Sequence, residues 1–195
     1  MIWFLMLPLE IAFTLLALLL APVLPLFARD DYGFCDNANA MRTEPRLPSW
    51  LSWFMTPDNS LYGDNGWRTE HCPDHWQDYW GMVQWLWRNS AYGFNWHGPI
   101  CAHIDAAATV KYSGDKDIGN RPIFKPGYCF VTVTNPDGSS YWHLYWVKQI
   151  SATYCLNINL GWKLKTYAED PERLKTQSVA MFTFSPRVAG FAAQP

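Results

Sequence analysis

The stretch that decides the fold is the first one, MIWFLMLPLEIAFTLLALLLAPVLPLFA, residues 1–28, in which Glu10 is the only charged side chain. At about 1.5 Å of rise per residue, a helix over residues 2–27 would reach roughly 40 Å, more than the ~30 Å hydrocarbon core of a bilayer. A water-soluble domain rarely begins with so long an apolar run. We therefore expect residues 1–28 to form a membrane-anchor segment.

Two other interpretations of this segment stay open. A cleaved signal peptide is the first, but no Lys or Arg precedes Arg29, and residues 26–28 lack a small residue two positions before Ala28, where the recognition of a cleavage site needs one. A helix that is buried, or that docks on another subunit, is the second.

The residues that follow the apolar segment predict its orientation. Arg29, Arg42 and Arg46 all lie after it, and basic residues flank the cytoplasmic side of membrane segments. The chain has 5 cysteines, which are spread singly and lack the paired spacing of a disulfide-bonded secreted protein. We expect a C-terminal domain in the cytoplasm, with reduced thiols.

Composition bounds the rest of the chain. The 195 residues are enough for the anchor, a polar connector over residues 29–48 and a single domain over residues 49–195. The net charge of −2 argues against nucleic acid as a partner. Tryptophan is unusually frequent, with 12 copies, and its apolar ring with one N–H suits the lipid headgroup layer as well as a protein core. The candidate interface residues are Trp50, Trp53, Phe54, Trp76, Trp80 and Trp87.

Periodicity predicts a helix followed by a sheet. Pro73 suits a helix start, and apolar residues recur at helical spacing through Trp80 and Trp87 to about Asn89. Strands are expected over residues 106–112, 130–134, 140–150, 154–164 and 179–185, with a tight turn at 135–138. The predicted fold is α+β, with an N-terminal hydrophobic helix, a Trp-rich amphipathic helix and an antiparallel β-meander of about four to six strands.

The clearest alternation lies in residues 154–164. Tyr154, Leu156 and Ile158 face one way, whereas Asn157 and Asn159 face the other. Such alternation is typical of an antiparallel sheet with one face on the core and one in water. Residues 141–147 are aromatic at both alternating sets of positions, which predicts a central strand.

Residues 71–75, His-Cys-Pro-Asp-His, are a candidate metal site. His71 and His75 are four residues apart, as on one face of a helix, and Cys72 is a further ligand type for zinc. However, Cys72 stands where the His-Glu-x-x-His metalloproteases carry their glutamate. Polar residues around a helix start explain the same string, and a bound divalent metal stays an alternative.

Candidate catalytic acids are Asp58, Asp64 and Glu70, because a hydrolase uses acids of this kind in pairs. Residues 56–67 are dense in turn formers, and Asp and Asn in turns usually accept hydrogen bonds from nearby backbone. The sequence contains neither a phosphate-binding glycine loop nor a nucleophile elbow. It therefore favours a protein without catalytic activity and without a cofactor.

Several strings in the chain are distinctive together. They are LPSWLSWF at 47–54, TPDNSLYGDNGW at 56–67, LWRNSAYGF at 86–94, LGWK at 160–163 and FSP at 184–186. With the apolar leader, they resemble a family of small uncharacterised proteins from tailed bacteriophages and prophages of Gram-negative bacteria. The resemblance implies viral origin, a bacterial host and a membrane-associated N-terminal segment, and it carries no catalytic residue.

The function expected from these observations is that of a non-enzymatic phage accessory protein in the host inner membrane. Its Trp-rich face would engage the lipid bilayer or a host envelope or phage protein. One alternative is a membrane-associated, metal-dependent hydrolase using Asp58, Asp64, His71 and His75. The other is a virion or assembly component that docks through its apolar helix.

Overall fold

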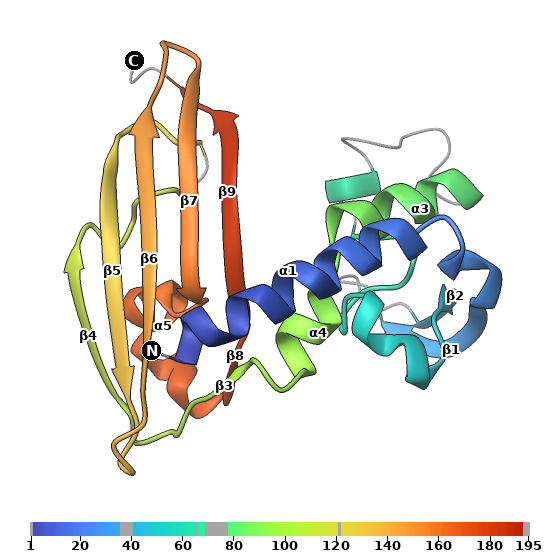
Figure 1. Cartoon of the computed structure of the whole chain (residues 1–195), viewed down its shortest axis with the longest axis horizontal. Coiled ribbons are helices and arrows are strands. Elements are labelled where there is room, and N and C mark those ends of the chain that lie inside the picture. The colour runs from blue at the N-terminus through green and yellow to red at the C-terminus, as the bar shows by residue number, and fades with distance from the viewer. Residues whose placement is uncertain (1, 36–40, 65, 69–77, 121, 193–195) are drawn as a thin grey trace. The chain divides into compact units, whose positions relative to one another are not determined.

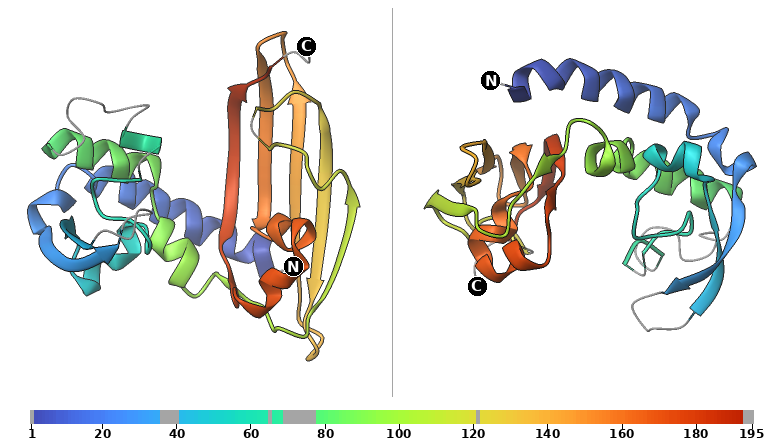
Figure 2. Two further views of the ribbon diagram at one scale, coloured as in Figure 1. Left: turned by 180° about the vertical axis from the view of Figure 1, so that it is seen from behind. Right: turned by 90° about the horizontal axis from the view of Figure 1, so that it is seen from below.

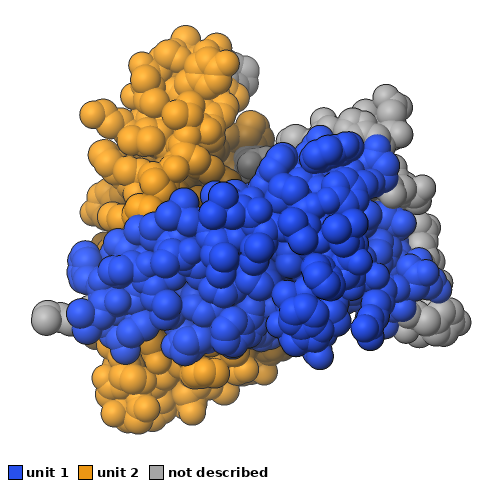
Figure 3. Space-filling view, turned by 45° about the vertical axis from the view of Figure 1, so that its right-hand side comes forward, with its two compact units in different colours: residues 1–100 blue, residues 101–195 orange. Residues whose placement is uncertain are grey.

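The computed structural model describes residues 2–35, 41–64, 66–68, 78–120 and 122–192. The chain forms two compact units, residues 1–100 and 101–195, shown in blue and orange in Figure 3. Helices and antiparallel sheets occur together, which confirms the α+β prediction. The chain divides after Ile100, whereas the sequence predicted one domain over residues 49–195.

Unit 1 contains both predicted helices (Figure 1). Its elements are α1 (Ile2–Leu20), the 3₁₀ turn η1 (Leu24–Phe27), β1 (Arg29–Cys35), β2 (Met41–Arg46), the 3₁₀ turn η2 (Ser49–Phe54), α3 (Tyr79–Arg88) and α4 (Tyr92–His97). Among the described residues, α1 alone is long and apolar enough to cross a membrane. It ends just before Pro22, which cannot donate a helical hydrogen bond.

The segment predicted to be an irregular connector is instead a β-hairpin. β1 pairs antiparallel with β2, and Arg29 lies opposite Arg46. The Arg46 guanidinium donates to the carbonyl oxygens of Pro57, at 3.0 Å, and Asn59, at 3.2 Å. These bonds tie the hairpin to the turn-rich segment that follows η2.

An apolar core and a buried ion pair hold unit 1 together. The core comprises Ala21, Leu24, Leu47, Leu51, Met55, Leu61, Val83 and Leu86. Beside it, the Arg68 guanidinium lies 2.9 Å from the Glu44 carboxylate, which also accepts a hydrogen bond from the Ser60 hydroxyl. Because all three side chains are buried, they fix β2 against residues 60–68.

The Trp-rich helix α3 begins at Tyr79, where the Asp78 carboxylate accepts a hydrogen bond from the Gly81 N–H at 2.8 Å. The predicted start at Pro73 lies outside the described residues. The inward side of α3 carries Val83, Trp85 and Leu86, which are buried. Trp80 and Trp87, through which the sequence predicted the apolar helical spacing to run, are exposed.

Unit 2 is built on a five-stranded antiparallel sheet in the order β4-β5-β6-β7-β9, which confirms the predicted meander and the central place of β6. Its elements are β3 (Ala102–His103), β4 (Thr109–Gly114), β5 (Gly127–Thr134), β6 (Ser140–Gln149), β7 (Tyr154–Trp162), α5 (Lys165–Glu169), the 3₁₀ turn η3 (Pro171–Lys175), β8 (Val179–Ala180) and β9 (Phe182–Gly190). The β5–β6 turn is the predicted one, with Gly138 at φ 86° donating to the Asn135 carbonyl oxygen at 3.0 Å.

Both faces of this sheet carry apolar side chains, and several polar side chains are buried on one of them. The face toward α5, here called the covered face, carries the buried residues Cys129, Val131, Val133, His143, Tyr145, Val147, Cys155, Asn157 and Thr183. The opposite one, the open face, carries the exposed residues Tyr128, Phe130, Trp146, Tyr154, Phe184 and Val188. The alternation predicted along residues 154–164 is therefore present, but Asn157 is fully buried whereas Tyr154 is 56% exposed.

Candidate functional site

The most unusual surface of unit 1 is a continuous apolar one on α1 and η1, here called the apolar face. Its exposed members are Ile2, Phe4, Leu5, Leu9, Ile11, Leu15, Leu16, Leu18, Leu19, Val23, Leu26 and Phe27. Leu19 is 77% exposed. Large exposed apolar surfaces of this kind mark sites that bind a membrane or another protein.

A narrow inward side of α1 opposes this face. Glu10 and Ala17 are buried and lie seven residues apart, and Ala21 and Leu24 continue the same side into the core. Seven residues are close to two helical turns, so these positions line up along the helix. α1 runs alongside α3 and α4 in Figures 1 and 2.

Three contacts attach the inward side of α1 to the rest of unit 1. The Glu10 carboxylate, only 5% exposed, accepts hydrogen bonds from Thr14 Oγ1 at 3.0 Å and Asn95 Nδ2 at 3.4 Å. The Phe13 ring stacks on Phe94 of α4, with 4.1 Å between the ring centroids, and on Phe54 of η2, at 4.9 Å.

The third contact follows directly from a proline. In a continuous helix, the Leu18 carbonyl would accept from the N–H of residue 22, but Pro22 has none. The Trp87 indole Nε1–H donates to this carbonyl oxygen instead, at 2.9 Å. A tryptophan of α3 thereby completes the end of α1.

The predicted interface tryptophans border the apolar face in part. Trp50 is 67% exposed, and its ring meets the Phe27 ring edge-on at 5.8 Å. Trp53, Trp80 and Trp87 are exposed as well. Phe54 is half-buried in the stack with Phe13, and Trp76 lies outside the described residues.

The candidate acids are engaged in turns. The Asp64 carboxylate accepts from the Trp67 backbone N–H at 2.7 Å, and Asp58 accepts from the Asn59 side chain at 3.1 Å. Asp58 also lines a small cavity of about 100 Å³ with Tyr92 and Trp96. Burial and the nearby Asp58 charge raise the pKa of Tyr92.

The candidate metal ligands His71, Cys72 and His75, and the acid Glu70, lie outside the described residues. Within the part of the chain that the structure describes, no group of three or more His, Cys, Asp or Glu side chains is placed to hold a metal ion. The metal site therefore stays a prediction.

Sequence reasoning missed a buried histidine in unit 2. His143 Nδ1 accepts hydrogen bonds from the backbone N–H groups of Leu164, at 3.3 Å, and Lys165, at 3.0 Å, at the start of α5. Its Nε2 bonds to the Asn159 side chain. Burial lowers the pKa of His143 to about 4, so the ring is neutral at pH 7. The sequence did contain a signal for this site. His143 lies within an aromatic strand, and the next strand carries Asn157 and Asn159 at alternating positions.

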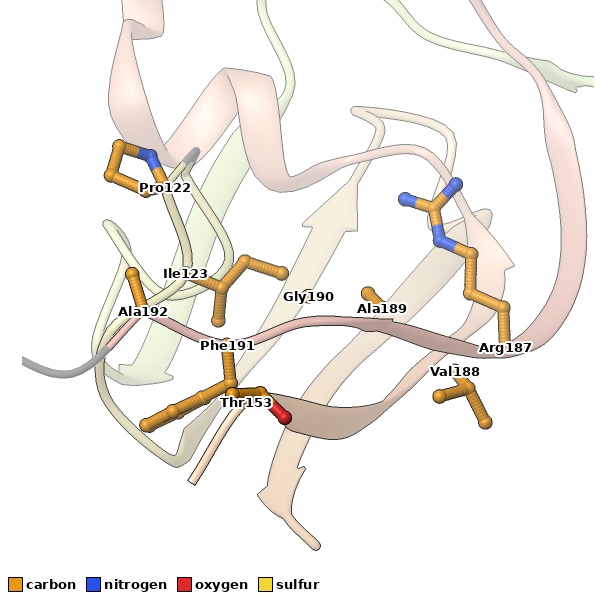
Figure 4. A pocket seen from close by; sticks show the side chains of 9 residues that line it. All are labelled: Pro122, Ile123, Thr153, Arg187, Val188, Ala189, Gly190, Phe191 and Ala192. Carbon is orange, nitrogen blue, oxygen red and sulfur yellow. The ribbon is translucent and has the colours of Figure 1, made fainter. Parts of the chain in front are cut away.

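Unit 2 also carries an open groove of about 820 Å³ along β9 (Figure 4). Arg187 lies toward one end of it, whereas Ile123 and Phe191 lie toward the other. Ala189 and Gly190 lie between these ends. Arg187 is the one ionisable residue among the described residues of this lining, so the described part of the groove holds no acid–base pair.

Comparison with known proteins places the chain in a family. A family described as "Family of unknown function (DUF7338)" matches residues 1–189. No curated protein and no solved structure matches the chain. The protein thus belongs to the DUF7338 family of unknown function.

Proposed function

We propose that this protein is a non-enzymatic, phage-encoded accessory protein that attaches to the inner membrane of a bacterial host. The single observation that carries membrane attachment is the apolar face of α1 and η1. The resemblance of its distinctive strings, above all residues 56–67 and 86–94, supports the phage origin.

The free energy gained by moving the apolar face out of water is large enough for binding to a bilayer. Moving one Leu or Phe side chain from water into an apolar environment contributes roughly 1.5–3 kcal/mol. A single myristoyl chain binds membranes with a constant of about 10⁴ M⁻¹, which corresponds to about 5.5 kcal/mol. Insertion of three or four Leu or Phe side chains would contribute about as much as the myristoyl chain, and α1 and η1 together expose more than four such side chains.

The polar groups of the described residues support binding over catalysis. Asp64 is used to cap a turn, and His143 is held neutral and fully hydrogen-bonded beneath α5. Burial raises the pKa of the Cys129 and Cys155 thiols, which disfavours the nucleophilic thiolate. These groups stabilise the fold, and a binding role needs none of them free.

The test is fractionation of the full chain expressed in a Gram-negative bacterium. We expect the wild type and the conservative variant Leu19→Ile to sediment with membranes. Leu19→Glu should increase the soluble share roughly tenfold or more, since a charge replaces a lipid-facing Leu and each 1.4 kcal/mol is about tenfold. A wild-type chain that stays in the supernatant contradicts the proposal. Detection of the chain in purified phage particles by mass spectrometry would favour the virion alternative.

A further inference from the structure

We infer that α1 lies in the plane of the bilayer surface and does not cross the bilayer. This inference rests on the proposed membrane attachment and specifies its geometry. The helix would be embedded by its apolar face in one leaflet, while its inward side stays on unit 1. Length and composition alone, which α1 satisfies for a crossing helix, do not distinguish the two geometries.

The contacts that attach α1 to α3, α4 and η2 lie between Glu10 and Leu18 of the helix. Glu10 bonds to α4, Phe13 stacks on both η2 and α4, and the Leu18 carbonyl accepts from α3. After the helix, Ala21 and Leu24 enter the apolar core. A helix that crossed a bilayer would have to leave these partners, which would expose Phe94, Val83 and Leu86 to water.

The place of Glu10 gives the second argument. It is the ninth residue of the 19-residue α1, so a crossing helix would carry this carboxyl group to the middle of the hydrocarbon. Charged side chains are strongly disfavoured there. In the folded unit the carboxylate points away from the apolar face and is buried against Thr14 and Asn95.

Charge also identifies the occupant of the apolar face. Glu10 is the sole charged residue in the first 28, and it points inward, so the exposed side of α1 and η1 is uncharged. The next charged residues, Arg29 and Asp30, are exposed immediately after η1. An uncharged face bordered by the exposed indoles of Trp50 and Trp87 is complementary to acyl chains beneath headgroups.

The experiment places one epitope tag at each end of the full chain. Inverted inner-membrane vesicles and spheroplasts, which expose opposite sides of the same membrane, are treated with protease before tag detection. An in-plane helix leaves both tags on one side, so both are cleaved in one preparation and both are protected in the other. A crossing helix places the tags on opposite sides, whatever its orientation.

Each outcome is decisive. Equal cleavage of the two tags on membrane-bound protein supports the in-plane helix. Cleavage of one tag in each preparation overturns it and leaves the proposed membrane attachment intact. A chain that is absent from membranes, as a soluble monomer or as a dimer joined through α1, overturns both proposals.

Discussion

His143 shows at the scale of one side chain how a strand residue supports a distant helix. Its Nδ1 accepts from two backbone N–H groups at the start of α5, and α5 has no side-chain cap among the described residues. Protonation of Nδ1 removes this acceptor. Burial is the largest cause that lowers the pKa of His143, from the ordinary 6.5 of the unfolded chain to about 4; the hydrogen bond to Asn159 opposes it, and the Lys163 and Lys165 charges add to it.

The sign of the pH dependence follows from this lowered pKa. The stabilisation is complete above about pH 6.5 and is lost as the pH falls toward 4, because the unfolded chain binds the proton first. Between pH 7.5 and 4.5, we expect His143 to account for a loss of about 2.5 kcal/mol in the free energy of unfolding. Urea titrations of the wild type and His143→Asn at both pH values check this. Equal pH dependence in the two proteins would contradict it.

Glu10 and Asn95 form the second residue-scale pair. Asn95 Oδ1 is buried and has no partner among the described residues, so Glu10 provides the bond that its amide group makes. We expect Glu10→Leu to lower the free energy of unfolding by about 1–3 kcal/mol, since it removes that bond. The double variant Glu10→Leu/Asn95→Leu should recover part of the loss. Thermal unfolding of all four proteins gives the coupling, and strictly additive losses would count against it.

At the scale of elements, α4 and η2 are in contact through a glycine. A Cβ on Gly93 would lie 2.2 Å from the Ser52 carbonyl oxygen and 2.6 Å from that of Met55. This close approach places Phe94 and Asn95 where they meet α1. The glycine of the string at residues 86–94 is therefore explained by packing.

Gly93→Ala should consequently separate α4 from η2 and lower the free energy of unfolding by about 1–3 kcal/mol or more. Gly190→Ala is the matched control, because no atom lies within 4 Å of the added methyl group. Chemical unfolding of both variants checks the difference. A loss of similar size at Gly190 would show that the effect is not steric.

At the scale of the whole molecule, local sequence patterns predicted where helices and strands lie better than they predicted which side of each element is buried. The Asn135 turn and the alternation along β7 placed the strands correctly, because both signals are local. Which face of the sheet is covered depends on the face against which α5 packs, and no local sequence pattern specifies this packing. The β1–β2 hairpin was missed because polar residues and Pro45 obscure any alternation.

The candidate site followed the same division. The apolar run was evident from residues 1–28. The sequence also offered surface exposure as one of two interpretations of the tryptophans, the other being a protein core, and several of them are exposed. The inward side of α1 was not evident, since nearly every position is apolar and periodicity disappears in a uniform segment. Only Glu10 marks that side in the sequence, and its meaning depends on Asn95, which lies 85 residues away.

Two exposed apolar surfaces in one chain predict its behaviour in solution. The apolar face of α1 and the open face of the sheet both place large side chains in water. We expect the purified full chain to self-associate without detergent and to disperse when a mild detergent is added. Size-exclusion chromatography with light scattering measures this, and a monodisperse monomer in plain buffer would refute it.

The bond between the Trp87 indole and the Leu18 carbonyl has a consequence for how this sequence can vary. One residue inserted between Glu10 and Leu18 would rotate the two parts of α1 by about 100° relative to each other. Either the Glu10 carboxyl group would then keep its bond to Asn95, or the Leu18 carbonyl would keep its bond to Trp87, but not both. We therefore expect insertions and deletions to be excluded from this interval, while the outward apolar positions within it, such as Leu15 and Leu16, exchange freely with other apolar residues.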